Sequence, residues 1–75
     1  MKQDHGGYVF TTTKIVDNQD GYFGLELHRS HDGKSQPVAK VVFWDAEGQY
    51  SVETMGEVPL TILEELILEA RNTGR

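Results

Sequence analysis

The most reactive residue types in the sequence lie together near its middle. His28, Ser30, His31 and Asp32 supply two imidazoles, a hydroxyl and a carboxylate. Zinc accepts such ligands, but their spacing matches no established zinc motif. A Ser-His-Asp triad needs the fold to place the imidazole between hydroxyl and carboxylate, which consecutive residues seldom achieve. We therefore expect solvated side chains here, and we predict neither a metal site nor a catalytic site.

Two pairs of carboxylates are the other candidates for acid–base chemistry. Glu64 and Glu65 are neighbours at the start of an expected helix, and Asp45 and Glu47 lie in an expected turn. Both pairs are expected to be hydrated, whereas catalytic acids work in concave, partly dehydrated sites. The glycines lack the spacing of a phosphate-binding loop. The sequence thus predicts a protein that is not an enzyme and holds no cofactor.

Length and composition limit the protein to one small domain. The chain has 75 residues, a net charge of −5 and no cysteine, so disulfides and thiolate chemistry are excluded. A chain of this size buries only about 60% of the surface that it exposes when unfolded, so self-association would add useful stability. The sequence shows no signal peptide and no apolar run of about 20 residues. We expect a cytoplasmic protein without a membrane partner.

The negative charge is concentrated in the second half of the chain. Seven of the twelve acidic residues lie in residues 41–75, and the only basic residues of this segment are Arg71 and Arg75. Such a field repels phosphate backbones, so nucleic acid is not the expected partner.

Clusters of turn-forming residues at 17–21, 30–37 and 45–48 divide the chain into four strand-like segments and one helical segment. The predicted fold is α+β: a four-stranded antiparallel meander followed by one C-terminal helix on one face of the sheet. Residues 1–7 are expected to be loose, and residues 72–75 to be frayed. The four strands are predicted at 8–16, 22–29, 38–44 and 49–55.

The middle strands can be aligned because cross-strand partners must share a face of the sheet. Placing Phe23 opposite Phe43 gives one apolar face and sets Glu26 opposite Lys40. A four-residue turn between the third and fourth strands then sets Lys40 opposite Glu53 as well. The alignment of the first strand remains open, because Tyr8 and Phe10 compete with Val9 and Ile15 for the inner face.

The helical segment begins near Pro59, where the apolar period changes to that of an amphipathic helix. We expect Leu63 and Ile67 at the centre of its buried stripe and Leu68 on its exposed side.

One face of the predicted sheet has no helix to cover it, and this face carries the functional hypothesis. Its aromatic and charged side chains are typical of a contact with another protein or a second copy. A solvated face, or one covered by loops, is an equally good interpretation. The predicted interaction face consists of Tyr22, Glu26, His28, Val38, Lys40, Val42, Trp44 and Glu53.

These observations predict a non-enzymatic protein-interaction module that forms a homodimer through this face. The alternative is a regulator of nucleic-acid transactions. Such a regulator would be an acidic antagonist of a basic protein, or a weak direct binder that uses Tyr22, Trp44 and Lys40.

Overall fold

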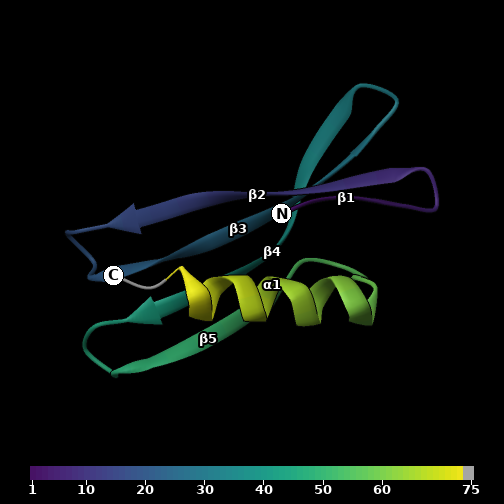
Figure 1. The fold of residues 1–75 in the computed structure, drawn as a ribbon. Coiled ribbons are helices and arrows are strands. Elements are labelled where there is room, and N and C mark those ends of the chain that lie inside the picture. The colour runs from purple at the N-terminus through teal and green to yellow at the C-terminus, as the bar shows by residue number, and fades with distance from the viewer. Residues whose placement is uncertain (74–75) are drawn as a thin grey trace.

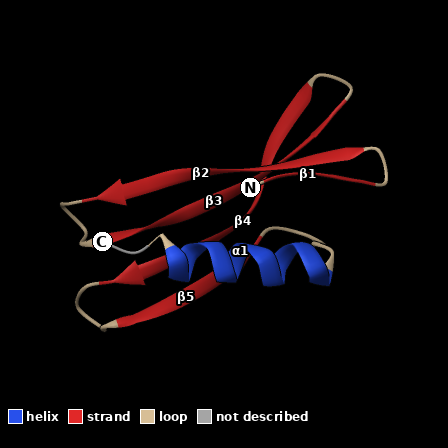
Figure 2. Cartoon of the chain, in the orientation of Figure 1, coloured by secondary structure: helices blue, strands red, loops and turns tan. Residues whose placement is uncertain are grey.

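The protein forms a five-stranded antiparallel sheet followed by one helix that lies across one face of the sheet (Figures 1 and 2). The structure is a computed structural model that describes residues 1–73. The strands are neighbours in the order in which they occur along the chain. The predicted meander and C-terminal helix are confirmed, with one strand more than expected. The elements are β1 (Lys2–His5), β2 (Tyr8–Asp17), β3 (Tyr22–His31), β4 (Lys34–Trp44), β5 (Gln49–Thr54) and α1 (Leu60–Asn72).

The additional strand is β1, which occupies the segment expected to be loose. Gly6 and Gly7 both have positive φ angles, 61° and 87°, and close a tight hairpin that pairs His5 with Tyr8. Two such residues suit the twist of a two-residue hairpin. The strand itself is polar, so it carries no apolar alternation that would reveal it. At the other end of the chain, Asn72 still belongs to α1, and Thr73 caps the helix through its N–H, which donates to the carbonyl oxygen of Glu69 at 2.9 Å. The other residues of the segment predicted to be frayed, 74–75, lie outside the described residues.

The hairpin between β3 and β4 is longer than expected, because most of the segment 30–37 is strand rather than turn. Only Asp32 and Gly33 form the turn, and both have positive φ angles, 51° and 77°. The pairing shifts between Leu27 and His28, whose partners are Ala39 and Pro37, so Val38 is an extra residue on β4. This β-bulge interrupts the alternation of side chains along β4, so Val38 lies on the opposite face from the one predicted.

The rest of the predicted alignment is confirmed. Phe23 pairs with Phe43, and their rings lie 5.3 Å apart between centroids. Lys40 is flanked by Glu26 on β3 and Glu53 on β5. The alternation of side chains therefore places every second residue of these strands on the helix side, where the core lies.

The hydrophobic core lies between α1 and the middle of the sheet. Leu66 is fully buried in it, whereas Leu63 and Ile67 are half-buried at one flank of the helix. The expectation that Leu63 and Ile67 form the centre of the stripe is therefore wrong. The buried residues of α1 are Ile62, Leu66 and Ala70, so the centre lies about one residue away. The exposure of Leu68 is confirmed, at 59%. No helix within residues 1–73 is long and apolar enough to cross a membrane. The buried core residues are Phe10, Leu25, Leu27, Val38, Ala39, Val41, Ile62, Leu66 and Ala70.

Candidate functional site

The sheet face opposite α1, here called the outer face, carries seven of the eight residues of the predicted interaction face. None of the described elements lies over it (Figure 2). The eighth, Val38, was wrongly placed on this face: the bulge turns its side chain to the helix side, where it is 2% exposed in the core. The residues on the outer face are Tyr22, Glu26, His28, Lys40, Val42, Trp44 and Glu53.

A small apolar cluster on the outer face is closed by its own side chains. The rings of Tyr22 and Trp44 pack together with centroids 4.8 Å apart, and both residues are half-buried. Val42 is only 3% exposed, although it does not belong to the core beneath α1. Val42 is therefore shielded from water on a face that no described helix or strand covers. This packing accounts for much of the apolar character that suggested a partner.

Gly24 lies beside Val42 at a point where β3 and β4 approach closely. A methyl group at Gly24 would overlap the carbonyl oxygen of Val41 and lie 2.8 Å from the Cα atom of Val42. Glycine in a strand interior commonly marks such a close backbone approach. The residue is therefore a structural requirement of the outer face.

The charged residues of the outer face are arranged differently from the expected row of ion pairs. Nε2 of His28 lies 3.0 Å from Oε1 of Glu26 and 3.4 Å from the hydroxyl of Thr13. Within residues 1–73, no ion pair includes Lys40. The predicted alignment of Glu26, Lys40 and Glu53 holds for the backbone, but the carboxylate of Glu26 pairs with His28 and not with Lys40.

His31 does not join Ser30 and Asp32 in a catalytic arrangement. Its Nδ1 lies 3.2 Å from the carbonyl oxygen of Gly7, and its Nε2 lies 3.2 Å from Oδ2 of Asp32. Both ring nitrogens thus face atoms other than the hydroxyl of Ser30. In the described part of the chain, no three potential metal ligands come together.

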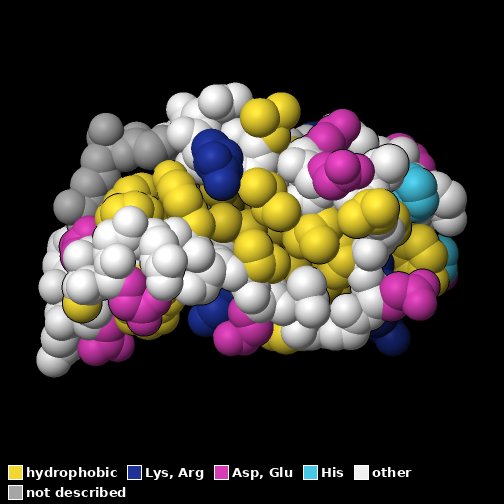
Figure 3. All heavy atoms as spheres, turned by 90° about the horizontal axis from the view of Figure 1, so that it is seen from below, with side chains coloured by type: hydrophobic (Ala, Val, Ile, Leu, Met, Phe, Trp, Pro, Cys, Tyr) yellow, Lys and Arg dark blue, Asp and Glu magenta, His cyan; other side chains and the backbone are white. Residues whose placement is uncertain are grey.

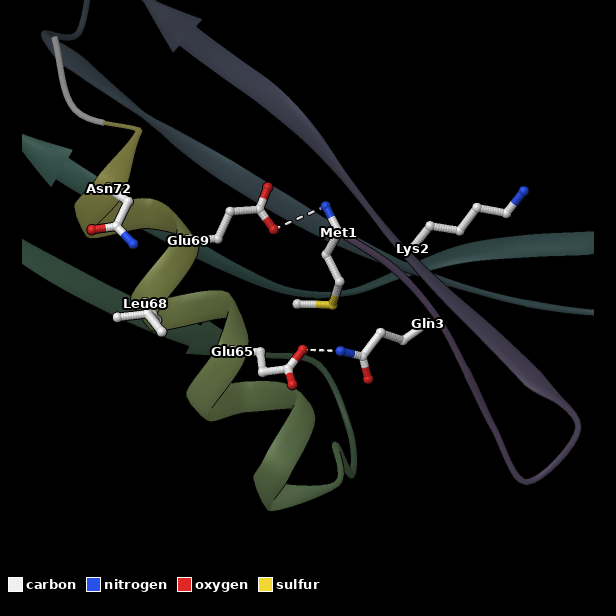
Figure 4. A pocket seen from close by; sticks show the side chains of 7 residues that line it. All are labelled: Met1, Lys2, Gln3, Glu65, Leu68, Glu69 and Asn72. Atoms are coloured by element: carbon white, nitrogen blue, oxygen red, sulfur yellow. Dashed lines mark hydrogen bonds and ion pairs between the residues drawn. The ribbon is translucent and has the colours of Figure 1, made fainter.

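A hollow of about 450 Å³ lies between β1 and α1 (Figure 4). The N-terminal ammonium of Met1 lies 2.9 Å from Oε1 of Glu69, and the side-chain amide of Gln3 donates to Glu65. Thr12 on β2 also donates to Glu69, at 2.8 Å. Both carboxylates already have partners, so we interpret them as the contacts that hold β1 and β2 against α1. Leu68 lines the same hollow.

An exposed apolar surface lies on the opposite flank of α1, beside β5. Figure 3 views the molecule from this side and shows a continuous band of hydrophobic side chains. Val52 and Leu60 are 47% and 70% exposed. The other members are half-buried against the core. We call this surface the β5–α1 strip; it consists of Tyr50, Val52, Val58, Leu60, Leu63 and Ile67.

The free edge of β5 borders the β5–α1 strip. The N–H of Met55, just after β5, donates to the carbonyl oxygen of Val38 at 2.8 Å and so faces β4. Backbone groups alternate in direction along an antiparallel strand, so those of Ser51 and Glu53 also face β4. The N–H and C=O groups of Tyr50, Val52 and Thr54 therefore point away from the sheet.

The other edge of the sheet, β1, is better protected against pairing. It is only four residues long and carries Lys2, Asp4 and His5. Short length and charged side chains are common means by which sheet edges avoid association. On β5, Glu53 is the only charged residue. The prediction from the sequence concerned the faces of the sheet alone and did not include pairing at the edge of β5. The last strand of a meander is nevertheless always an edge strand.

Comparisons of the chain with protein-family models, with curated proteins and with solved structures find no match.

Proposed function

We propose that the protein is a non-enzymatic protein-interaction module that self-associates by pairing β5 with β5 of a second copy. The observation that carries this proposal is the symmetry of the free edge. The outward backbone groups belong to Tyr50, Val52 and Thr54, which are spaced evenly about Val52. A two-fold axis at Val52 would place each outward donor opposite an outward acceptor.

The hydrogen-bond register follows from this axis. Val52 would exchange both of its backbone hydrogen bonds with Val52 of the second copy. Tyr50 would do the same with Thr54 of the second copy, and Thr54 with Tyr50. This is the pattern of hydrogen-bonded pairs in an antiparallel ladder, where paired Cα atoms lie about 5.5 Å apart. Such a contact is isologous, as most homodimer contacts are.

The side chains of β5 support the same register. On the helix side, the two Val52 side chains would cover each other, and their present exposure is 47%. On the outer face, Glu53 would lie opposite Ser51 of the second copy rather than opposite another glutamate, so like charges would not meet directly. In this register the outward N–H and C=O groups of β5 would be hydrogen-bonded, and no two like charges would lie directly opposite each other.

Sedimentation equilibrium with a proline variant tests the proposal. The backbone N–H that Val52→Pro removes points away from β4, and proline is tolerated at such edge positions. We expect the wild type to be dimeric at about 100 μM, which corresponds to about −5.5 kcal/mol or tighter. Val52→Pro should be a folded monomer by circular dichroism. Val52→Thr keeps the N–H and the branched shape, and should remain dimeric.

A monomeric wild type at this concentration would contradict self-association. A Val52→Pro variant that is still dimeric would show that β5 is not the contact.

The outer face is a second candidate for the contact, favoured by the Tyr22–Trp44 ring pair, whose centroids lie 4.8 Å apart. Large aromatic side chains are frequent anchors of interfaces. The same sedimentation series decides between the two surfaces when Trp44→Ala is included. Dissociation by Trp44→Ala, together with a dimeric Val52→Pro variant, would assign the contact to the outer face.

A further inference from the structure

A cationic group lies at the end of the sheet that projects beyond the start of α1. The guanidinium carbon of Arg29 on β3 lies 5.1 Å from the ring centroid of Tyr8 on β2, which is a cation–π contact. Within residues 1–73, Arg29 forms no ion pair with a carboxylate. Arginine lacks acceptors and has five N–H donors, so most of its binding capacity remains free.

The Tyr8 ring that contacts Arg29 is positioned by its neighbours. His31 packs on the same Tyr8 ring with centroids 4.6 Å apart, and its Nδ1 faces the carbonyl oxygen of Gly7 at 3.2 Å. These contacts connect the hairpin that joins β1 to β2 with the hairpin that joins β3 to β4. The ring against which Arg29 packs is therefore in place before any ligand arrives, which lowers the entropic cost of binding.

A hollow of about 210 Å³ opens beside Arg29 and contains no carboxylate among its lining residues. Lys34 adds a second permanent cation, although the chain as a whole carries a net charge of −5. A second hollow of about 290 Å³ on the other side of Tyr8 includes Glu57 and suits an anion less well. The residues that line the first hollow are Tyr8, Arg29, His31, Lys34, Ser35 and Gln36.

We propose that the first hollow binds the phosphate group of a small phosphomonoester. The planar fork of Arg29 matches two phosphate oxygens, and the ammonium of Lys34 acts as a point charge. Gln36, which pairs with Arg29 across the strands and shares its face of the sheet, supplies neutral donors beside them. A doubly charged phosphomonoester gains more from two cations than a singly charged phosphodiester does. The net negative charge of the chain also opposes a long nucleic-acid backbone.

This proposal does not depend on the proposed self-association, because none of the lining residues belongs to β5. It also differs from the nucleic-acid hypothesis of the outer face, because it uses the other face and other residues.

A nuclear magnetic resonance titration with inorganic phosphate, at constant ionic strength set with chloride, tests the site. We expect saturable shifts of the backbone amides of Arg29, Lys34 and Ser35. Arg29→Gln should weaken phosphate binding about tenfold or more, because it removes charge-assisted hydrogen bonds. Lys34→Gln, at an exposed position, should weaken it about threefold or more without affecting the fold. Arg71→Gln on α1 is the matched control and should leave binding unchanged.

Three results would overturn the proposal. Shifts that do not saturate, or that occur equally with chloride, would show that the hollow holds no phosphate. Equal affinity in the wild type, Arg29→Gln and Lys34→Gln would place binding elsewhere. Tighter binding of a short oligothymidylate without terminal phosphate would identify a nucleic-acid backbone as the ligand instead.

Discussion

Two backbone details at the scale of single residues decide which side chains reach the outer face. The bulge at Val38 moves one apolar side chain from the outer face into the core. The close approach at Gly24 leaves no room for a side chain beside Val42. The bulge explains why the outer face is less apolar than its sequence pattern predicts, and the close approach explains why position 24 of this face is a glycine.

Gly24→Ala is expected to destabilise the protein by about 2 kcal/mol or more. The added methyl overlaps backbone atoms of β4, which cannot rotate away as a side chain would. Ser51→Ala is the control, because Ser51 is the β5 partner of Val42 and shares the outer face. It should change the free energy of unfolding by less than about 0.5 kcal/mol. Urea denaturation of both variants makes the comparison, and equal losses would contradict the close approach.

The residue pairs were predictable where the alternation of the strands is regular. Matching Phe23 with Phe43 fixed the faces of β3, β4 and β5, because a shift by one residue would have turned every side chain over. The bulge was not predictable from the same rule, because an extra residue interrupts the alternation on which the rule depends. Pro37, which lacks an N–H, is the one sequence feature beside the bulge that indicates an irregular ladder.

At the scale of secondary structure, α1 separates two different surfaces. Its centre, at Leu66, packs on the sheet. One flank carries Glu65 and Glu69, which contact β1 and the N-terminus. The other flank carries Leu63 and Ile67 and continues into the β5–α1 strip. The apolar period predicted the helix but not this division, since the stripe is broad enough to accept a centre at Leu63 or at Leu66.

Alanine substitutions on α1 test this orientation. Leu66→Ala should lower the free energy of unfolding by about 2–5 kcal/mol, because it leaves a cavity at a fully buried position. Leu68→Ala removes the same atoms from a side chain that is 59% exposed, and should cost less than about 1 kcal/mol. Thermal or urea denaturation measures both values. A larger loss for Leu68→Ala than for Leu66→Ala would mean that the helix presents a different face to the sheet.

At the scale of the whole molecule, the sheet has two unlike edges. β1 is short and charged, and the side chain of Gln3 donates a hydrogen bond to Glu65 on α1. β5 instead has outward-pointing backbone N–H and C=O groups beside apolar side chains. The sequence predicted self-association but assigned it to a face. It offered no means of recognising β1, and therefore no comparison between the two edges. Because of this difference between the two edges, we propose that the contact forms at β5.

Cysteine cross-linking tests the proposed two-fold axis at Val52. The chain contains no cysteine, so each single variant has one reactive thiol. In the proposed dimer, the two Cα atoms at position 52 lie about 5.5 Å apart, within the range of a disulfide. The two copies of Thr54 are offset by four residues along the strands, or about 14 Å. Thr54 is nevertheless an exposed β5 residue like Val52.

Oxidation of Val52→Cys and Thr54→Cys, followed by non-reducing electrophoresis, is therefore the decisive measurement. We expect rapid formation of a covalent dimer by Val52→Cys and little or none by Thr54→Cys at the same concentration. Equal cross-linking of the two variants would contradict the axis at Val52. A dimeric protein in which Val52→Cys fails to cross-link would contradict β5 pairing while leaving self-association in place.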